Sequence, residues 1–189
     1  MVKLAEFKDK RTDVLNFFIK KREELNSQIK KECNIEIVEK LSDEVLNRMI
    51  ELEQEIYGIK EIEFQKNEMI EYFNKKDSIV IILIIDQKIE GYAFGYAEEI
   101  VKGTEYYGED IIISLKYQQK RIGEKLHLCY LYAIFCLGYR TFGFTTAHID
   151  KAGRELVKWY KSQGCEDAES ATKIGHPMRI RLSEEYFEQ

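Results

Sequence analysis

The residues best suited to chemistry lie in one short segment, between an apolar stretch and a long apolar helix. From Lys116 to Lys125 the sequence reads KYQQKRIGEK, with four cations, two glutamines and one glycine. The first N–H groups of a helix have no acceptor inside it, and the helix dipole adds partial positive charge there. Gly123 has no side chain to keep a ligand away from the backbone. Such a turn is suited to binding a pyrophosphate.

This segment resembles the acetyl-CoA site of the GNAT superfamily, whose pattern is Gln/Arg-x-x-Gly-x-Gly/Ala between a strand and a helix. Gln118 and Gly123 match the first and last positions, and Arg121 replaces the first glycine. If that position needs a positive φ, an arginine is strained there; if it is helical, its charge adds to the site at no cost. A motif this short is not specific by itself, because an ordinary loop followed by a helix that begins with basic residues would also match it.

The resemblance implies that acetyl-CoA binds to this turn as a cosubstrate. The residues that would hold its pyrophosphate are consecutive: Gln118, Gln119, Lys120, Arg121, Ile122, Gly123 and Glu124. In this family the preceding strand carries a bulge and diverges from the next parallel strand, and backbone amides in the gap bind pantetheine. In this chain the resemblance assigns those amides to Ile113 and Leu115.

A second segment, Trp159 to Cys165, resembles the family pattern Tyr-x-x-x-Gly-Phe. The resemblance makes Tyr160 the general acid, which would protonate the departing thiolate. Gly153 stands where the family usually has Asn, and Cys165 replaces the aromatic residue; neither removes a group that the reaction needs. The alternative is that Trp159 and Tyr160 only pack their helix onto the sheet.

Attack of an amine on a thioester needs an uncharged nitrogen, so a base is expected near the acyl group. The family often places a Glu or His near the start of the diverging strand, and Glu109 holds that place. Asp110 would then point to the opposite face, because side chains alternate along a strand. The alternatives are that Glu109 is a solvated strand-end carboxylate, or that His148 is the base.

Acidic side chains gather near two segments that border the acceptor site in this family: Glu98, Glu99, Glu105 and Glu109 with Tyr106 and Tyr107, and Glu51, Glu53, Glu55 and Glu61 with Tyr57. Such a mouth would attract a cationic amine, such as a small polyamine or aminoglycoside, a Lys side chain or a peptide N-terminus. The competing interpretation is that these charges mark solvated faces.

The elements that must position these residues follow from hydrophobic periodicity. Residues 10–31 form an amphipathic helix, which would pack on the domain or on a second copy of the chain in a homodimer. A strand over 34–41 precedes a helix from the Ser42 cap to Tyr57, ended by Gly58, and a second helix over 63–75. The continuous apolar run 78–86 predicts a central strand, and a tight turn leads to the strand 89–99, which has small residues on one face and aromatic residues on the other.

The second half of the chain is predicted to alternate strands and helices. A loop over 101–108 leads to a strand over 109–115, a helix over 121–137, a strand over 139–147, a helix capped by Asp150 that runs to residue 163, and two strands within 165–182. This order predicts a mixed α/β (α+β) fold: a GNAT-like sheet of about seven strands, with splayed central parallel strands and flanking helices. Residues 1–33 would be an N-terminal helical extension, and residues 34–189 the acetyltransferase domain.

Composition limits the remaining possibilities. A net charge of −5 over 189 residues argues against a nucleic-acid partner, and no apolar run is long enough to cross a membrane. Four cysteines and three histidines lack metal-site spacing, so no metal is expected. Without an apolar export signal, the expected compartment is the cytoplasm.

The sequence therefore predicts an N-acetyltransferase that moves an acetyl group from acetyl-CoA to a primary amine by direct attack in a ternary complex. One alternative is a non-catalytic acyl-CoA-binding sensor of the same fold. Another is a generic α/β nucleotide-binding or interaction module, with the N-terminal helix recruiting a partner. The sequence does not identify the acceptor amine.

Overall fold

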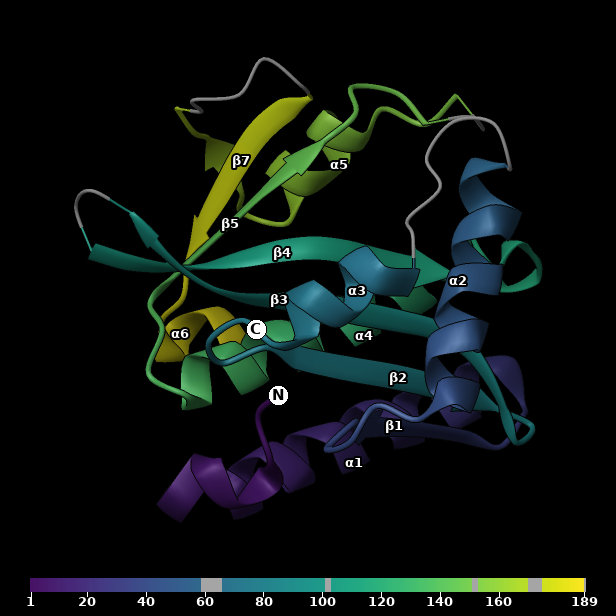
Figure 1. Ribbon diagram of the computed structural model, residues 1–189. Coiled ribbons are helices and arrows are strands. Elements are labelled where there is room, and N and C mark those ends of the chain that lie inside the picture. Colours follow the sequence, from purple (N-terminus) through teal and green to yellow (C-terminus); the bar gives the residue numbers. More distant parts are fainter. Residues whose placement is uncertain (59–65, 101–102, 151–152, 170–174, 189) are drawn as a thin grey trace.

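The fold is built on one mixed sheet. We analysed a computed structural model, which describes residues 1–58, 66–100, 103–150, 153–169 and 175–188. In this part of the chain seven strands lie in the order β1-β2-β3-β4-β5-β7-β6 (Figure 1). Their bounds are β1 Cys33–Ile37, β2 Ile79–Ile85, β3 Lys88–Ile100, β4 Gly103–Ile113, β5 Thr141–Thr146, β6 Glu166–Asp167 and β7 His176–Arg181. Only β4 and β5 pair in parallel among them, so the predicted mixed α/β architecture is confirmed.

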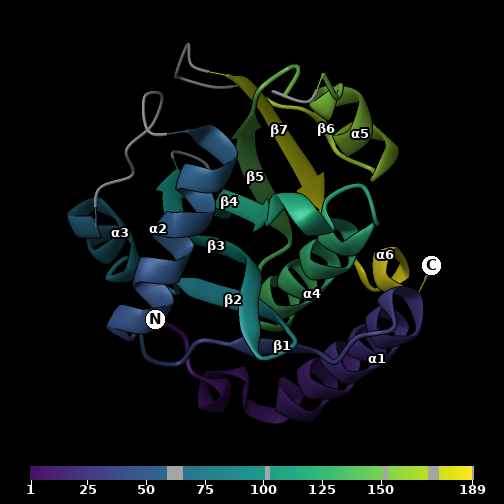
Figure 2. The same cartoon turned by 90° about the vertical axis from the view of Figure 1, so that its right-hand side faces the viewer.

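Helices cover both faces of the sheet. The α-helices are α1 Arg11–Ile29, α2 Asp43–Tyr57, α3 Lys66–Phe73, α4 Ile122–Cys136, α5 Leu156–Ser162 and α6 Glu184–Phe187, and two 3₁₀ helices are η1 Leu4–Lys10 and η2 Leu115–Tyr117. Helices α2 and α3 lie on one face, and α4 lies on the other with α1 beside it (Figure 2). Each face therefore has its own hydrophobic core.

Strand β3 shows why the two cores differ. Its small residues Ala93 and Ala97 are buried in the core under α4, and its large residues Tyr92, Phe94 and Tyr96 are buried in the core under α2 and α3. The predicted alternation of small and aromatic side chains is confirmed. The small face lets the long helix α4 approach the sheet closely, which brings the start of α4 to the edge of the central strands.

The N-terminal helix packs on its own chain. Val14, Phe18 and Leu25 of α1 are buried in the same core as α4. The ammonium of Lys125 on α4 pairs with Glu24 Oε2 of α1 at 2.5 Å. The sequence left open whether this helix packs on its own domain or on a second copy of the chain. In the structure it packs on its own domain, against α4 and β1.

Local signals in the sequence fix several element ends. The Ser42 hydroxyl accepts a hydrogen bond from Val45 N at 3.2 Å and caps α2, and Gly58 ends that helix with a φ of 75°. Asp86 and Gln87 both have positive φ, at 49° and 64°, in the tight turn between β2 and β3. These three predictions are confirmed.

Three predicted boundaries are wrong. Strand β4 begins at Gly103 rather than Glu109, because the hairpin with β3 continues through residues predicted as loop. It ends at Ile113, so Leu115 lies in η2 rather than in the strand. Helix α5 begins at Leu156, and Asp150 does not cap it; the Asp150 carboxylate accepts Arg154 N at 2.9 Å in the preceding turn.

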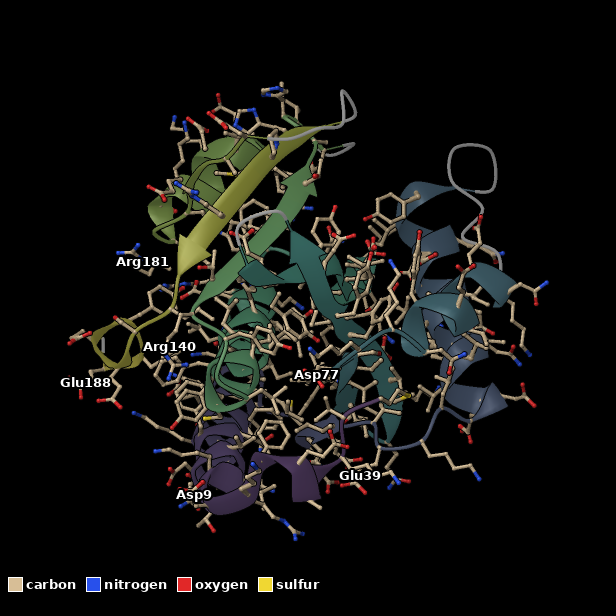
Figure 3. The ribbon with its side chains drawn as sticks, turned by 60° about the vertical axis from the view of Figure 1, so that its left-hand side comes forward. Asp9, Glu39, Asp77, Arg140, Arg181 and Glu188 are labelled. Atoms are coloured by element: carbon tan, nitrogen blue, oxygen red, sulfur yellow. The ribbon has the colours of Figure 1, made fainter. Side chains whose placement is uncertain are left out.

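Most charged side chains lie on the surface, including the exposed Asp9, Arg140, Arg181 and Glu188 (Figure 3), while Glu53 and Glu90 are buried. Across the part of the chain that the structure describes, no helix is both long and apolar enough to cross a membrane. The same residues contain no group of three or more His, Cys, Asp or Glu side chains arranged to hold a metal ion.

Candidate active site

The two parallel strands at the centre of the sheet diverge. They pair over only three positions, Tyr106 with Phe142, Tyr107 with Gly143, and Gly108 with Phe144. Strand β4 continues to pair with β3 as far as Ile113, while β5 leaves at an angle (Figure 1). A V-shaped gap therefore opens beyond Gly108.

A β-bulge lies at the point of divergence. The register of β3 against β4 shifts between Phe94 and Gly95, so that Glu109 has no partner on β3. Beyond the bulge, Ser114 N donates to Glu90 O at 2.8 Å. Because backbone groups alternate along a strand, the N–H groups of Ile111 and Ile113 then point away from β3 and into the gap. The bulge that the family resemblance implied is present.

The start of α4 borders this gap. Arg121 is the N-cap, with φ 53° and ψ 17°, and its side chain does not cap the helix. The motif position therefore has a positive φ, the strained case for a residue other than glycine. The guanidinium pairs with Glu124 through two contacts of 3.0 Å, so these two charges largely satisfy each other. A Cβ added to Gly123 would meet only Ile113 Cγ1, at 3.5 Å.

Two cavities meet along the gap. One, of about 720 Å³, includes Gln118, Gln119, Arg121, Ile122, Gly123, Glu124 and Lys158 in its lining, and the other, of about 480 Å³, includes Tyr57, Glu109, Asp110 and Leu115. Both are lined by Ile111, Ile113, Gln118, Arg154, Leu156 and Tyr160. At the start of α4 the first cavity has both charges, because Arg121 pairs with Glu124 and Lys158 pairs with Glu155. The second cavity, next to α2, is the acidic side of the cleft, with Glu109, Asp110 and Asp150 in its lining.

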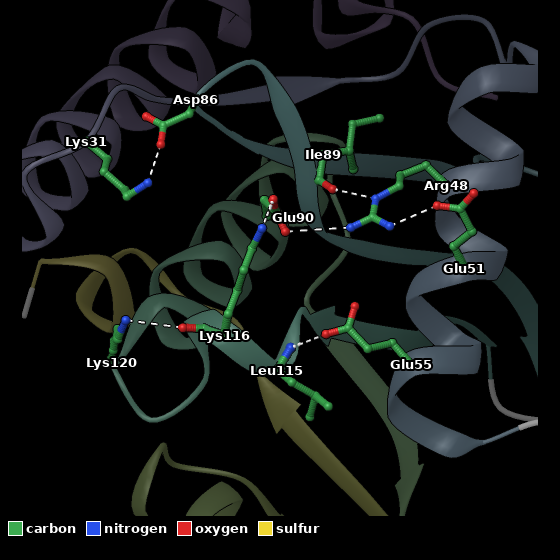
Figure 4. A network of polar contacts seen from close by, with 10 residues as sticks. All are labelled: Lys31, Arg48, Glu51, Glu55, Asp86, Ile89, Glu90, Leu115, Lys116 and Lys120. Carbon is green, nitrogen blue, oxygen red and sulfur yellow. Dashed lines mark hydrogen bonds and ion pairs between the residues drawn. The ribbon is translucent and has the colours of Figure 1, made fainter.

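Some residues of the predicted cofactor turn already have protein partners (Figure 4). Leu115 N donates to Glu55 Oε1 at 2.6 Å. Lys116 pairs at 2.5 Å with Glu90, which is buried and also lies 3.6 Å from Arg48. Lys120 donates to the carbonyl of Lys116 at 3.2 Å. These contacts hold the turn in shape, so Lys116 has a structural partner that the sequence did not reveal.

Gln118 and Arg154 form a bridge across the gap. Gln118 Nε2 donates to Ile113 O at 3.0 Å, and Gln118 Oε1 accepts from Arg154 Nη2 at 3.1 Å. Sequence reasoning missed Arg154, because residues 150–163 were expected to form one helix. The φ of 77° at Gly153 instead lets the chain turn, which aims the arginine at the cavities.

Tyr160 lies where the two cavities meet. Its ring packs 4.4 Å from that of Phe144 and 4.7 Å from that of Trp159, measured between centroids. Its hydroxyl makes no hydrogen bond to the residues that the structure describes. Burial raises the pKa of this phenol, and the charges of Cys165 and Asp110 raise it further. The neutral phenol can therefore donate a proton at any pH near neutrality.

Glu109 and Asp110 both line the acidic cavity, which corrects the expectation that they face opposite ways. Tyr96 OH donates to Glu109 Oε1 at 2.5 Å, and Tyr57 OH donates to Asp110 Oδ1 at 3.2 Å. The alternation is broken because Glu109 is the extra residue of the bulge. Burial is the main cause that raises the pKa of Glu109.

Other predicted site residues lie elsewhere. Tyr106 is buried in the core, where its hydroxyl donates to Gly95 O at 2.8 Å and accepts from Ile79 N at 3.0 Å. His148 meets the ring of His176 edge to face, with centroids 4.8 Å apart, and lines neither cavity. Glu61 and the side chain of Glu99 lie outside the part that the structure describes.

Comparisons with known proteins give no sequence match and a clear structural one. No protein-family model matches the chain, and no curated protein sequence matches it. Many solved structures are similar, and three of them illustrate the likeness. The PaiA N-acetyltransferase of Thermoplasma acidophilum, solved with coenzyme A, is 20% identical, with a TM-score of 0.58 over 79% of this chain and 99% of that one. The ribosomal-protein-S18-alanine N-acetyltransferase of Escherichia coli is 16% identical, with a TM-score of 0.59 over 79% and 94% of the two chains. An aminoglycoside 6'-acetyltransferase type Ii is 12% identical, with a TM-score of 0.65 over 78% and 96%. At these identities the likeness shows the fold.

Proposed function

We propose that this chain, whose fold is that of the GCN5-related N-acetyltransferases, transfers an acetyl group from acetyl-CoA to a primary amine by direct attack in a ternary complex. One observation carries the proposal. Strands β4 and β5 separate beyond Gly108, beside a helix start that no side chain caps, and open a cleft that runs from the start of α4 to an acidic side next to α2. Acetyl-CoA would enter from the first side and the amine from the second.

The residues around the start of α4 fit the phosphates of acetyl-CoA. No side chain caps the first turn, so its N–H groups are open to an anion, and the missing side chain of Gly123 leaves room beside them. We assign the pyrophosphate to the turn from Gln118 to Glu124, with Lys158 and Arg154 nearby in the cavity lining. The cosubstrate brings the reactive thioester; the chain contributes binding and orientation.

The backbone of β4 would orient the acyl group. We assign the Ile113 amide to polarise the thioester carbonyl, with the Ile111 amide as a second donor, because both N–H groups face the gap. The resemblance also assigned an amide to Leu115. Glu55 accepts that hydrogen bond, so a ligand would have to displace Glu55 to use it.

Tyr160 is the proposed general acid. It lies between the two cavities and its hydroxyl is free of other described partners, so it can give its proton to the sulfur that leaves. A carboxylate of the β4 bulge is the proposed base. The sequence favoured Glu109 for this role, and Asp110 lies beside it on the same face.

The acidic cavity supports a cationic acceptor. Glu109 and Asp110 place negative charge where the amine would enter, which draws in an ammonium group. The acceptors named for proteins of similar structure include an aminoglycoside, glucosamine and an alanine of ribosomal protein S18. For this chain we propose that the acceptor is a small cationic amine, a Lys side chain or a peptide N-terminus. We also propose that the reaction takes place in the cytoplasm and involves no metal, nucleic acid or membrane. A homodimer stays a prediction.

Thiol release tests the proposal. Purified protein and acetyl-CoA would be incubated with spermidine, kanamycin, a lysine-containing peptide and a peptide with a free N-terminal alanine, and free CoA would be measured with a thiol reagent. We expect release that depends on one class of amine. Tight CoA binding without turnover on any amine would instead favour the non-catalytic sensor, and absence of CoA binding would refute both.

A further inference from the structure

Two carboxyl groups from different elements meet at the acidic end of the cleft. Glu53 comes from the last turns of α2, and Asp110 follows the bulge of β4. Glu53 is only 3% exposed, whereas Asp110 lines the cavity. The pair therefore joins the opening of the cleft to the hydrophobic core under α2.

The hydrogen bonds of this pair require a shared proton. Tyr92 OH donates to Glu53 Oε1 at 2.6 Å, and Tyr57 OH donates to Asp110 Oδ1 at 3.2 Å. A hydrogen bond between the two carboxyl groups contributes to raising the pKa of Glu53 and to lowering that of Asp110. Such a bond needs one proton on the pair, because ionised carboxylates only accept. Together with the two tyrosine hydrogen bonds and the burial of Glu53, it fits a protonated Glu53 beside an ionised Asp110.

The surroundings favour this division. Burial, followed by the negative charge of Asp110, raises the pKa of Glu53. Burial and the charge of Glu109 raise the pKa of Asp110, while the hydrogen bonds from Tyr57 and Glu53 lower it. The titratable groups that interact with Asp110 come from five elements: Glu53 and Tyr57 of α2, Tyr92 of β3, Tyr107 and Glu109 of β4, Tyr130 of α4, and Tyr160 of α5. None of them is a cation. The guanidinium of Arg154 lines the same cavity and contacts Gln118 and Asp150.

Glu109, by contrast, is engaged away from the pair. Its carboxylate accepts the hydroxyl of Tyr96, whose ring stacks on that of Tyr72 at 5.5 Å. The ammonium of Lys75 lies 3.8 Å from the centre of the Tyr96 ring and lowers the pKa of Glu109. Burial raises the pKa of Glu109, but the Tyr96 hydroxyl and the Lys75 cation both favour its ionised form, whereas no cation is among the groups that shift the pKa of Asp110.

We propose that Asp110 takes the proton from the acceptor ammonium and that Glu53 is a positioning residue that holds Asp110 ionised and oriented toward the cleft. This inference rests on the proposed function and names the base within that site. In the step, an N–H bond of the ammonium breaks and an O–H bond forms on Asp110, while Glu53 keeps its own proton. The pair is then neutral, and Asp110 returns the proton to water through the cavity after the acyl transfer.

The first test compares pH profiles of kcat/KM for thiol release with the most active amine of the panel. Asp110→Asn keeps acceptors for Tyr57 and Glu53, so it should fold, and we expect a loss of 100-fold or more at every pH, as for a missing general base. Glu109→Gln should lose at most about tenfold, with its acidic limb moved to lower pH, because the charge that raises the pKa of Asp110 is gone. Glu44→Gln, an exposed glutamate on the same helix α2, is the matched control and should leave the profile unchanged.

The second test concerns Glu53. Glu53→Gln can still donate a hydrogen bond to Asp110, so it should keep activity within about threefold and the same acidic limb. Glu53→Met removes the donor, so the acidic limb should move to higher pH; a merely structural role would lower activity without moving it. In ¹³C NMR of labelled carboxyl groups, the resonances of Glu53 and Asp110 should each respond to both protonation steps in the wild type. In Glu53→Gln only the Asp110 resonance of the pair remains, and it should titrate in a single step.

The outcomes separate this inference from the proposed function. If Glu109→Gln abolishes turnover and Asp110→Asn retains it, or if the two carboxyl resonances titrate independently near their ordinary pKa values, the inference is overturned and the acetyltransferase proposal stands. If the wild type releases no thiol with any amine, the proposed function fails, and the catalytic role of Asp110 fails with it.

Discussion

Replacing Tyr160 by Phe should separate catalysis from stability. The Tyr160 hydroxyl makes no hydrogen bond to the described residues, so its removal breaks no bond in the folded protein. The ring contacts with Phe144 and Trp159 are kept. The free energy of unfolding should therefore change by no more than about 0.5 kcal/mol.

The same change should strongly reduce turnover. Loss of a general acid typically costs 100-fold or more, which corresponds to about 2.7 kcal/mol of transition-state stabilisation. Because burial raises the pKa of Tyr160, the phenol is protonated throughout the range from pH 6 to 9, and the loss should be similar at each pH. The KM for acetyl-CoA should change little, since the proton is transferred only in the transition state.

The assay is thiol release at saturating amine, combined with urea unfolding of the same preparations. Tyr186→Phe is the matched control, because the Tyr186 hydroxyl donates to Gln163 O at 3.3 Å and the residue lines neither cavity. That variant should keep full turnover. Unchanged turnover of Tyr160→Phe across the pH range would remove this residue from the mechanism.

Three further predictions concern the scaffold. Burial lowers the pKa of His127 to about 4, so below pH 6.5 the unfolded chain binds a proton at this residue and the folded chain does not. Between pH 7 and pH 4 the wild type should therefore lose about 3 kcal/mol of its free energy of unfolding that His127→Leu does not lose. The same pH dependence of urea unfolding in both proteins would contradict this. Gly108→Ala places a Cβ 2.3 Å from the buried ring of Phe142 and should lower the free energy of unfolding in urea by about 1–3 kcal/mol. The control Gly143→Ala, whose nearest contact is at 3.6 Å, should leave it nearly unchanged, and equal effects would refute the crowding argument. Gly123→Ala, within the first turn of α4 and 3.5 Å from its only neighbour, should raise the free energy of unfolding by about 0.5–1 kcal/mol, and a decrease would show that the turn is not helical.

Local signals in the sequence predicted much of the scaffold. The Ser42 cap, Gly58, the turn at Asp86 and the alternating faces of β3 depend on neighbouring residues, and all agree with the structure. The motif also predicted the turn that leads into α4, and Arg121 is the N-cap of that helix. Pyrophosphate binding by this turn stays a prediction. These features could be predicted because their causes lie within a few residues of each other.

Features that depend on distant segments could not be predicted in the same way. The face on which Asp110 lies is set by the bulge opposite Phe94 and Gly95, which inserts one residue and cancels the period of two. Its partner Glu53 is 57 positions earlier in the numbering, on a helix whose contact with β4 only the fold establishes. Arg154 was missed because the turn at Gly153 interrupts a segment with helical periodicity.

The most direct test of the account is a melting scan of the protein with CoA, with ATP and NAD as comparison ligands. The central claim is that backbone donors at the start of α4, next to the diverging strands, hold the pyrophosphate of CoA. At 100 times its Kd, CoA should add about 2.7 kcal/mol to the stability of the folded chain and raise Tm by roughly 5–10 °C, while ATP and NAD at the same concentration should do less. An unchanged Tm with CoA at millimolar concentration would contradict the claim.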